Sequence, residues 1–190
     1  MLLKADENEL LSLHAWLIAS SQGRDSDDTF ACILATWQTG DSALPDWLGL
    51  GAEQFYRMLE FHFPGFPIDS LPNPGREAAA HRCDEQDELR TLLLSHRAGV
   101  STSEIWMAEV VAVASLGLDH LWQDMGLWSR KALGKLMMRN FPTLASQNNR
   151  DMKWKKFLYK QLCVAEGIYT CRSPSCERCT DYEQCFGLED

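Results

Sequence analysis

Residues 101–115 read Ser-Thr-Ser-Glu-Ile-Trp-Met-Ala-Glu-Val-Val-Ala-Val-Ala-Ser, and this stretch decides the fold. Ser101, followed three residues later by Glu104, fits a capping box, in which two side chains satisfy backbone N–H groups at the start of a helix. The helix that follows is apolar on nearly all sides, as Trp106 and Val111 illustrate. A helix without a polar face is surrounded by other elements. We therefore expect a central, buried helix.

Apolar residues recur at helical spacing on both sides of this stretch, and no run alternates as a strand would. Residues 63–75 contain four prolines and are expected to form an extended connector. Gly99 is expected to cap the helix that precedes the central one. The fold class is therefore all-α. Besides the central helix, the expected helices lie within residues 10–18, 30–37, 51–62 and 76–97, in a stretch that ends at Asn140, and in a last helix that Asn149 or Asp151 caps and that reaches Cys163.

Length and composition indicate one domain with a small appendage. The 190 residues are 45% hydrophobic and 24% charged, which is ordinary for a globular protein. No run of eighteen apolar residues is present, so we expect no membrane span. Acidic residues stand at positions 6 and 7, where a signal peptide needs a basic start and an apolar run, so we expect a cytoplasmic protein. The expected division is a helical body over residues 1–166 and a tail over residues 167–190.

The charge is distributed unevenly along the chain. The net charge is −9, yet residues 127–163 hold nine basic side chains and one acidic side chain. The acidic whole argues against nucleic-acid binding, which needs a basic surface. The basic segment suits a smaller anion or an acidic partner, and the simpler alternative is a solvated helix face.

Four cysteines stand close together in the tail: Cys171, Cys176, Cys179 and Cys185, called the tail cysteines below. Thiols stay reduced in the cytosol, so clustered cysteines there indicate metal binding rather than disulfides. Their spacing, Cys-x4-Cys-x2-Cys-x5-Cys, brings four thiolates near one another, and these would repel without a metal ion. A segment this short and poor in aliphatic residues also cannot build its own core, as expected where metal fixes the fold.

Two kinds of metal remain open on spacing alone. Zinc takes four thiolates, usually from two Cys-x2-Cys pairs, whereas this tail has only one such pair. One local pair flanked by single cysteines is common in iron–sulfur proteins, which favours a cluster modestly.

Several other stretches join the cysteine spacing to carry a family resemblance. They are Leu44-Pro-Asp-Trp-Leu-Gly-Leu50, His62-Phe-Pro-Gly65, Asp119-His-Leu-Trp-Gln-Asp-Met-Gly-Leu-Trp128, Asn140-Phe-Pro142, Asp151-Met-Lys-Trp-Lys-Lys-Phe-Leu-Tyr-Lys-Gln-Leu-Cys163 and Glu166-Gly-Ile-Tyr169. With the tail cysteines they closely resemble NifQ, the nitrogenase molybdenum-donor family. The resemblance spans most of the chain and is strongest after about residue 85.

The resemblance implies a molybdenum–iron–sulfur cluster protein that donates molybdenum for assembly of the nitrogenase iron–molybdenum cofactor. The cluster would be of the Mo–3Fe–4S type, with a 3Fe–4S or 4Fe–4S precursor, and the tail cysteines would be its ligands. Implied partners are the cofactor-assembly scaffold, the nitrogenase iron protein and a molybdate source. A carrier of this kind is not an enzyme, and no Ser-His-Asp grouping, phosphate loop or dinucleotide fingerprint is evident in the sequence.

Molybdenum prefers higher coordination than one thiolate supplies, so further ligands are conceivable. Cys163 is one candidate, although a buried helix cysteine is the commoner role. His120, between Asp119 and Asp124, is another, although a satisfied core histidine is the commoner role. His62, His81 and His96 have weaker claims, and Cys32 and Cys83 are expected to be packing or incidental residues. The lysines before the tail are expected to stabilise an anionic cluster or to guide molybdate or an acidic partner; they are Lys153, Lys155, Lys156 and Lys160.

Two rival functions are weighed against this one. A zinc-stabilised helical interaction module would use the tail as a structural element. An iron–sulfur DNA-repair glycosylase would also carry a four-cysteine cluster at its end, but the acidic chain and the lack of a glycine-turn hairpin followed by a basic residue argue against it.

Overall fold

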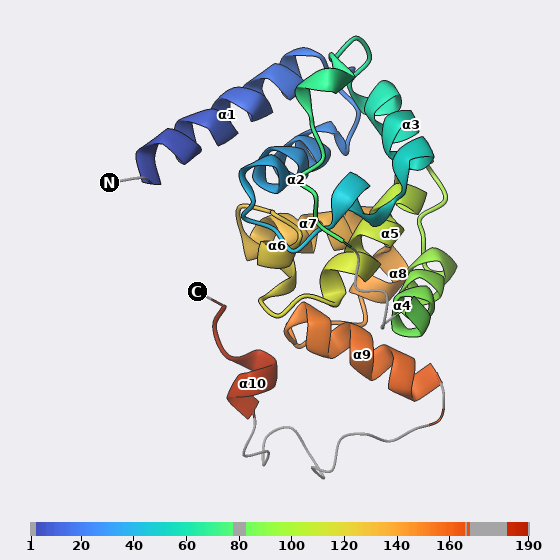
Figure 1. The fold of residues 1–190 in the computed structure, drawn as a ribbon. Coiled ribbons are helices and arrows are strands. Elements are labelled where there is room, and N and C mark those ends of the chain that lie inside the picture. Colours follow the sequence, from blue (N-terminus) through green and yellow to red (C-terminus); the bar gives the residue numbers. More distant parts are fainter. Residues whose placement is uncertain (1–2, 78–82, 166, 168–181, 190) are drawn as a thin grey trace.

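The computed structural model describes residues 3–77, 83–165, 167 and 182–189. Every regular element in these residues is helical, which confirms the all-α prediction (Figure 1). None of the described helices is long and apolar enough to cross a membrane. The helices are α1 (Leu3–Ala19), α2 (Asp27–Thr39), α3 (Ala52–His62), α4 (Cys83–Ser95), α5 (Ser103–Ser115), α6 (Leu121–Asp124), α7 (Arg130–Asn140), α8 (Pro142–Ala145), α9 (Trp154–Ala165) and α10 (Tyr182–Phe186), with 3-10 turns η1 (Asp46–Gly49) and η2 (Ile68–Ser70).

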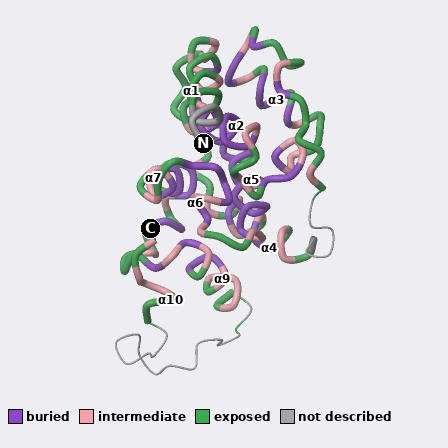
Figure 2. The backbone as a smooth tube through the Cα atoms, turned by 60° about the vertical axis from the view of Figure 1, so that its left-hand side comes forward, coloured by how far each residue is buried: buried purple, intermediate pink, exposed green. Residues whose placement is uncertain are grey.

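Helix α5 is the centre of the fold, as its apolar sequence predicts. All of its residues except Ile105 and Glu109 are buried, and the buried part of the tube runs through it in Figure 2. Helices α3, α4 and α6 and the turn η1 pack against it from different sides. Because α5 has no polar face, elements on several sides are needed to remove its apolar surface from water.

The carboxylate of Glu104 binds the backbone of the three residues 99–101 that precede α5. It accepts hydrogen bonds from the backbone N–H groups of Gly99 at 2.7 Å, Val100 at 2.8 Å and Ser101 at 2.9 Å. The glutamate half of the predicted capping box is therefore present and reaches two further donors. The serine half differs, because Ser101 Oγ accepts from the N–H of Ser103 rather than from that of Glu104.

Some helix ends differ from the sequence prediction. Helix α4 ends at Ser95, so Gly99, with a φ of +77°, lies in the following turn and does not cap it. Helix α9 begins at Trp154, and neither Asn149 nor Asp151 caps it. Asp151 has a φ of +56°, and its carboxylate accepts from the Arg130 guanidinium at 2.6 Å, a long-range contact that local spacing does not reveal.

The backbone of the turn η1 lies very close to the side chain of Val113 in α5. A Cβ at Gly49 would lie 2.6 Å from Cγ2 of Val113, and Gly49 has a φ of +80°. Only glycine meets both conditions without strain. This approach fixes the residues 44–50 against the central helix, and the Trp37 indole secures them further by donating to the Pro45 carbonyl at 2.9 Å.

Candidate metal centre

The structure places one of the four tail cysteines. Cys171, Cys176 and Cys179 lie outside the described residues, whereas Cys185 is half-buried in α10 and packs against the hydrophobic core. Its carbonyl accepts a hydrogen bond of 2.7 Å from the backbone N–H of Lys153, just before α9 begins. Cys185 is therefore held on the helical body at the start of the basic helix.

Several contacts dock α10 beside this point. Phe186 packs against the core, stacks on Tyr182 with ring centroids 4.7 Å apart, and lies 5.4 Å from the Arg150 guanidinium. The Lys153 ammonium donates to the carbonyl of Glu183 at 3.0 Å. Apolar and polar contacts thus act together, which is what a helix of five residues needs, since so short a helix is not stable alone.

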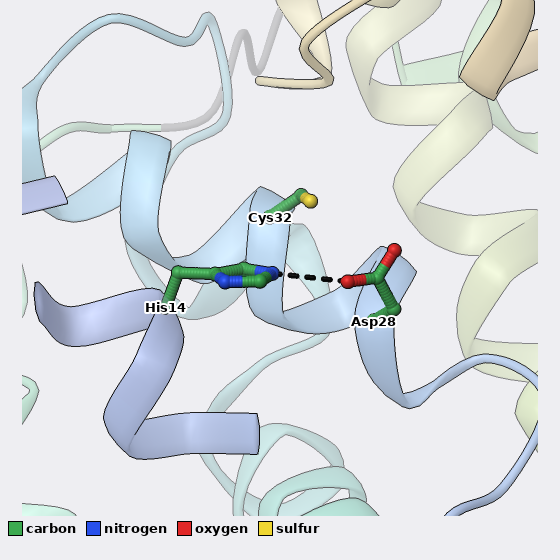
Figure 3. Close-up of side chains that lie close together, drawn as sticks. All are labelled: His14, Asp28 and Cys32. Atoms are coloured by element: carbon green, nitrogen blue, oxygen red, sulfur yellow. Dashed lines mark hydrogen bonds and ion pairs between the residues drawn. The ribbon is translucent and has the colours of Figure 1, made fainter. Parts of the chain in front are cut away.

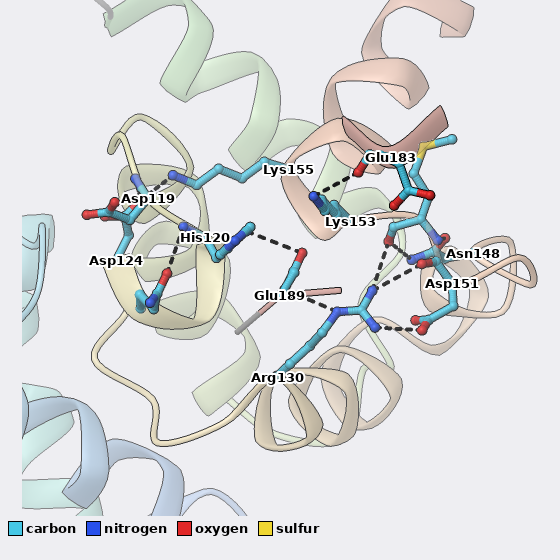
Figure 4. Close-up of polar contacts among 12 residues, drawn as sticks. Asp119, His120, Asp124, Arg130, Asn148, Asp151, Lys153, Lys155, Glu183 and Glu189 are labelled. Atoms are coloured by element: carbon cyan, nitrogen blue, oxygen red, sulfur yellow. Dashed lines mark hydrogen bonds and ion pairs between the residues drawn. The ribbon is translucent and has the colours of Figure 1, made fainter. Parts of the chain in front are cut away.

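Glu189 joins the chain end to two other elements, as Figure 4 shows. One oxygen lies 3.5 Å from Nδ1 of His120 and the other 3.1 Å from Nε of Arg130, with the Glu189 side chain only 3% exposed. Arg130 also pairs with Asp151. Burial lowers the pKa of Arg130, but the two carboxylates outweigh burial and raise it overall, so its charge is secure.

A second ion pair fixes α6 against α9. The Lys155 ammonium pairs with the Asp124 carboxylate and also donates to the Gly117 carbonyl at 2.9 Å. Burial raises the pKa of Asp124, and the contact with Lys155 opposes this rise. A Cβ at Gly117 would lie 2.5 Å from that carboxylate, so the loop before α6 also passes close to it. This pair sets the position of His120, which precedes α6.

Of the two additional ligand candidates, the structure brings His120 and not Cys163 toward the docked tail. His120 is partly exposed and contacts Glu189, four residues after Cys185. Cys163 lies ten residues after Lys153 along α9, so it is about 15 Å along the axis from the contact between Lys153 and Cys185. That separation is too long for Cys163 and Cys185 to share one cluster in this arrangement.

The lysines before the tail divide into two groups. The Lys153 ammonium donates to the carbonyl of Glu183, and Lys155 forms an ion pair with Asp124, so the first role of both lysines is structural. Lys156 and Lys160 are exposed. Between α7 and the start of α9, a shallow groove of about 480 Å³ holds three further basic side chains, and its lining residues are Arg130, Lys131, Gly134, Lys135, Met138, Asp151 and Trp154.

One polar grouping escaped the sequence analysis. His62 Nδ1 lies 2.6 Å from the Asp27 carboxylate, and its Nε2 lies 2.9 Å from Ser103 Oγ. The structure therefore contains a Ser-His-Asp grouping that is not evident in the sequence. All three side chains are buried, however, and burial lowers the pKa of His62 in spite of the Asp27 contact. The grouping ties the starts of α2 and α5 to the end of α3, and it offers a substrate no access.

Comparison with known proteins agrees with the resemblance seen in the sequence. The NifQ family model matches residues 29–187. Protein NifQ of Azotobacter vinelandii is 45% identical over 169 residues, which cover 83% of this chain and 86% of that protein. A NifQ homolog of Sinorhizobium fredii is 33% identical over 95% of this chain and 80% of its own length. NifQ of Rhodobacter capsulatus is 38% identical over 73% of this chain and 75% of its own length. No solved structure matches the chain. The chain belongs to the NifQ family.

Proposed function

We propose that this protein carries a molybdenum–iron–sulfur cluster and donates its molybdenum for assembly of the nitrogenase iron–molybdenum cofactor. Membership of the NifQ family associates the chain with the metabolism of that cofactor. The cluster is cargo of the Mo–3Fe–4S type, assembled on a 3Fe–4S or 4Fe–4S precursor. Its ligands are the tail cysteines, and the acceptors are the cofactor-assembly scaffold and the nitrogenase iron protein.

The observation that carries this proposal is the docking of Cys185 at the start of α9. The thiol-bearing helix is tied to Lys153 by one backbone and one side-chain contact. A cluster with four thiolates is anionic, and a basic helix beside it lowers the cost of gathering that charge. Exposed Lys156 and Lys160 add positive charge that no described contact neutralises, in a position to attract molybdate or an acidic partner.

The chemistry of the ligands suits a carrier. Thiolates hold iron firmly, and molybdenum accepts oxygen or nitrogen ligands beside them. His120, held by Glu189 at the same end of the body, supplies a ring nitrogen on the side where Cys185 docks. The partly exposed position of both residues leaves the metal accessible to an acceptor protein.

Anaerobic purification followed by metal analysis tests the proposal. The expected product is a brown protein that holds about three irons per molybdenum, as a Mo–3Fe–4S cube requires. A colourless protein with one zinc ion per chain would establish the interaction module instead. Tight, salt-sensitive binding of duplex DNA by the metal-loaded protein would favour the repair-protein alternative.

Single substitutions then assign the ligands. Each tail cysteine changed to serine is expected to lose iron and molybdenum while the far-ultraviolet circular dichroism of the helical body stays unchanged. Cys163→Ser is the matched control, because this thiol lies on α9 but away from Cys185, and it should keep the full metal content. Loss of metal in Cys163→Ser, with full retention in Cys185→Ser, would contradict the assignment.

A further inference from the structure

A second group of side chains that could bind a metal ion lies between α1 and α2, apart from the tail cysteines. His14 comes from α1, and Asp28 and Cys32 come from α2 (Figure 3). One possible ligand atom from each residue lies within 4.8 Å of the others. His14 Nε2 already contacts the Asp28 carboxylate at 3.1 Å.

Helix geometry explains why the three side chains converge. Asp28 and Cys32 are separated by four residues, so they share one face of α2. Helix α1 packs along that face and contributes His14. The His14 ring also packs on the Trp128 indole, with centroids 4.8 Å apart, and Trp128 donates to Thr36 of α2 at 3.2 Å. The imidazole is therefore oriented before any metal arrives.

We propose that His14, Asp28 and Cys32 form a site for a divalent transition-metal ion of borderline softness, such as Zn²⁺ or Fe²⁺. Imidazole nitrogen, carboxylate oxygen and thiolate sulfur are together the ligand types of tetrahedral Zn²⁺ sites with one open position, which water fills. Metal–ligand bonds of about 2.0–2.3 Å hold such atoms closer together than 4.8 Å, and the exposed Asp28 side chain can rotate to bring its carboxylate toward the ion.

The site differs from the tail in role and in place. It joins α1, which lies along the upper edge of the body in Figure 1, to α2, whose residues are mostly buried. A bound ion would clamp α1 onto the body. Cys32 must lose its proton when the metal binds, so each ion bound releases one proton from the thiol and no electron is transferred. The packing role expected for Cys32 from sequence is then only part of its function.

Titration with Co²⁺ under anaerobic conditions tests the proposal in the full-length chain with the tail cysteines changed to serine. Cobalt reports thiolate ligation by a sulfur-to-metal charge-transfer band and tetrahedral geometry by its visible bands. One equivalent is expected to bind and to show both. His14→Ala and Asp28→Asn should each weaken binding by at least about 100-fold, because even loss of outer support costs about 10- to 100-fold.

Control variants separate this site from other thiols and histidines. Cys32→Ser should abolish the charge-transfer band, whereas Cys163→Ser and His96→Ala should leave the titration unchanged. Zn²⁺ should raise the melting temperature of the chain without the tail cysteines, and should leave that of the same chain carrying His14→Ala unchanged. The His14 side chain is 18% exposed and packs on Trp128, so the melting temperatures of the two chains are compared with and without Zn²⁺ to separate lost packing from lost metal binding. Equal affinity in the parent and His14→Ala, or a band that follows Cys163, would overturn the proposal.

Discussion

Replacing Lys155 by methionine tests whether the Asp124–Lys155 pair holds α6 on α9. The two side chains are 4% and 17% exposed, and the change leaves the Asp124 charge buried while also removing the bond to Gly117. Breaking a buried pair costs about 3–5 kcal/mol. Because Asp124 keeps the N–H of Asp119 and Lys155 has some access to water, we expect the lower end, about 3 kcal/mol. For a chain of this length that corresponds to a fall in melting temperature of about 6–12 °C.

Urea unfolding followed by circular dichroism measures the difference, in a background without the tail cysteines and with a chelator present, so that metal contributes neither at the tail nor at His14, Asp28 and Cys32. Lys156→Met is the matched control, because Lys156 is exposed and its change should stay within about 0.5 kcal/mol. Adding Asp124→Asn to Lys155→Met should recover at least half of the loss. The deficit should also shrink as the pH falls, because burial raises the pKa of Asp124 and protonation removes the unpaired charge. If Lys155→Met matched Lys156→Met in stability, the pair would have no structural role.

Three further predictions follow from contacts elsewhere in the body. Burial lowers the pKa of His62 in the folded protein, so the unfolded chain takes up a proton at a higher pH than the folded protein does. The free energy of unfolding should therefore fall as the pH drops below about 6.5. The His62→Gln variant should lose this dependence of the free energy of unfolding on pH in urea unfolding. Gly49→Ala should cost about 1–3 kcal/mol more than Gly51→Ala, because both glycines have positive φ but only the first meets Val113; equal losses in urea unfolding would show that backbone conformation alone matters. Glu189→Gln should speed hydrogen exchange in α10 without changing that of α5, and unchanged exchange in α10 would argue against the anchoring role of Glu189.

The sequence predicted the parts of the fold that depend on local pattern. The apolar run through Trp106 and Val111 predicted a buried central helix, and Glu104 predicted a capped start. Short elements were harder. Helices α6 and α8 have four residues each, too few to establish a period, and the end of α4 at Ser95 reflects packing rather than the glycine that follows.

The candidate sites depend on contacts that local spacing cannot reveal. His62 meets Asp27 and Ser103 across 35 and 41 positions, and each residue taken alone is an ordinary helix-end residue. His120 meets Glu189 only because α10 folds back onto the body. The spacing of Asp28 and Cys32 is visible in the sequence, but nothing there indicates that α1 brings His14 to the same face.

The docking of α10 also changes the entropy of metal binding. Gly167 follows α9 and Tyr182 opens α10, so the stretch that holds three tail cysteines is attached at both ends. Closing a loop of this length from a free chain costs about 2 kcal/mol or more. Here the packing of Phe186 and the ion pairs of Glu189 supply that closure before any metal arrives. In the proposed cluster, the thiolates would therefore meet at a high effective concentration, and an acceptor that displaces α10 would weaken all four proposed metal contacts at once.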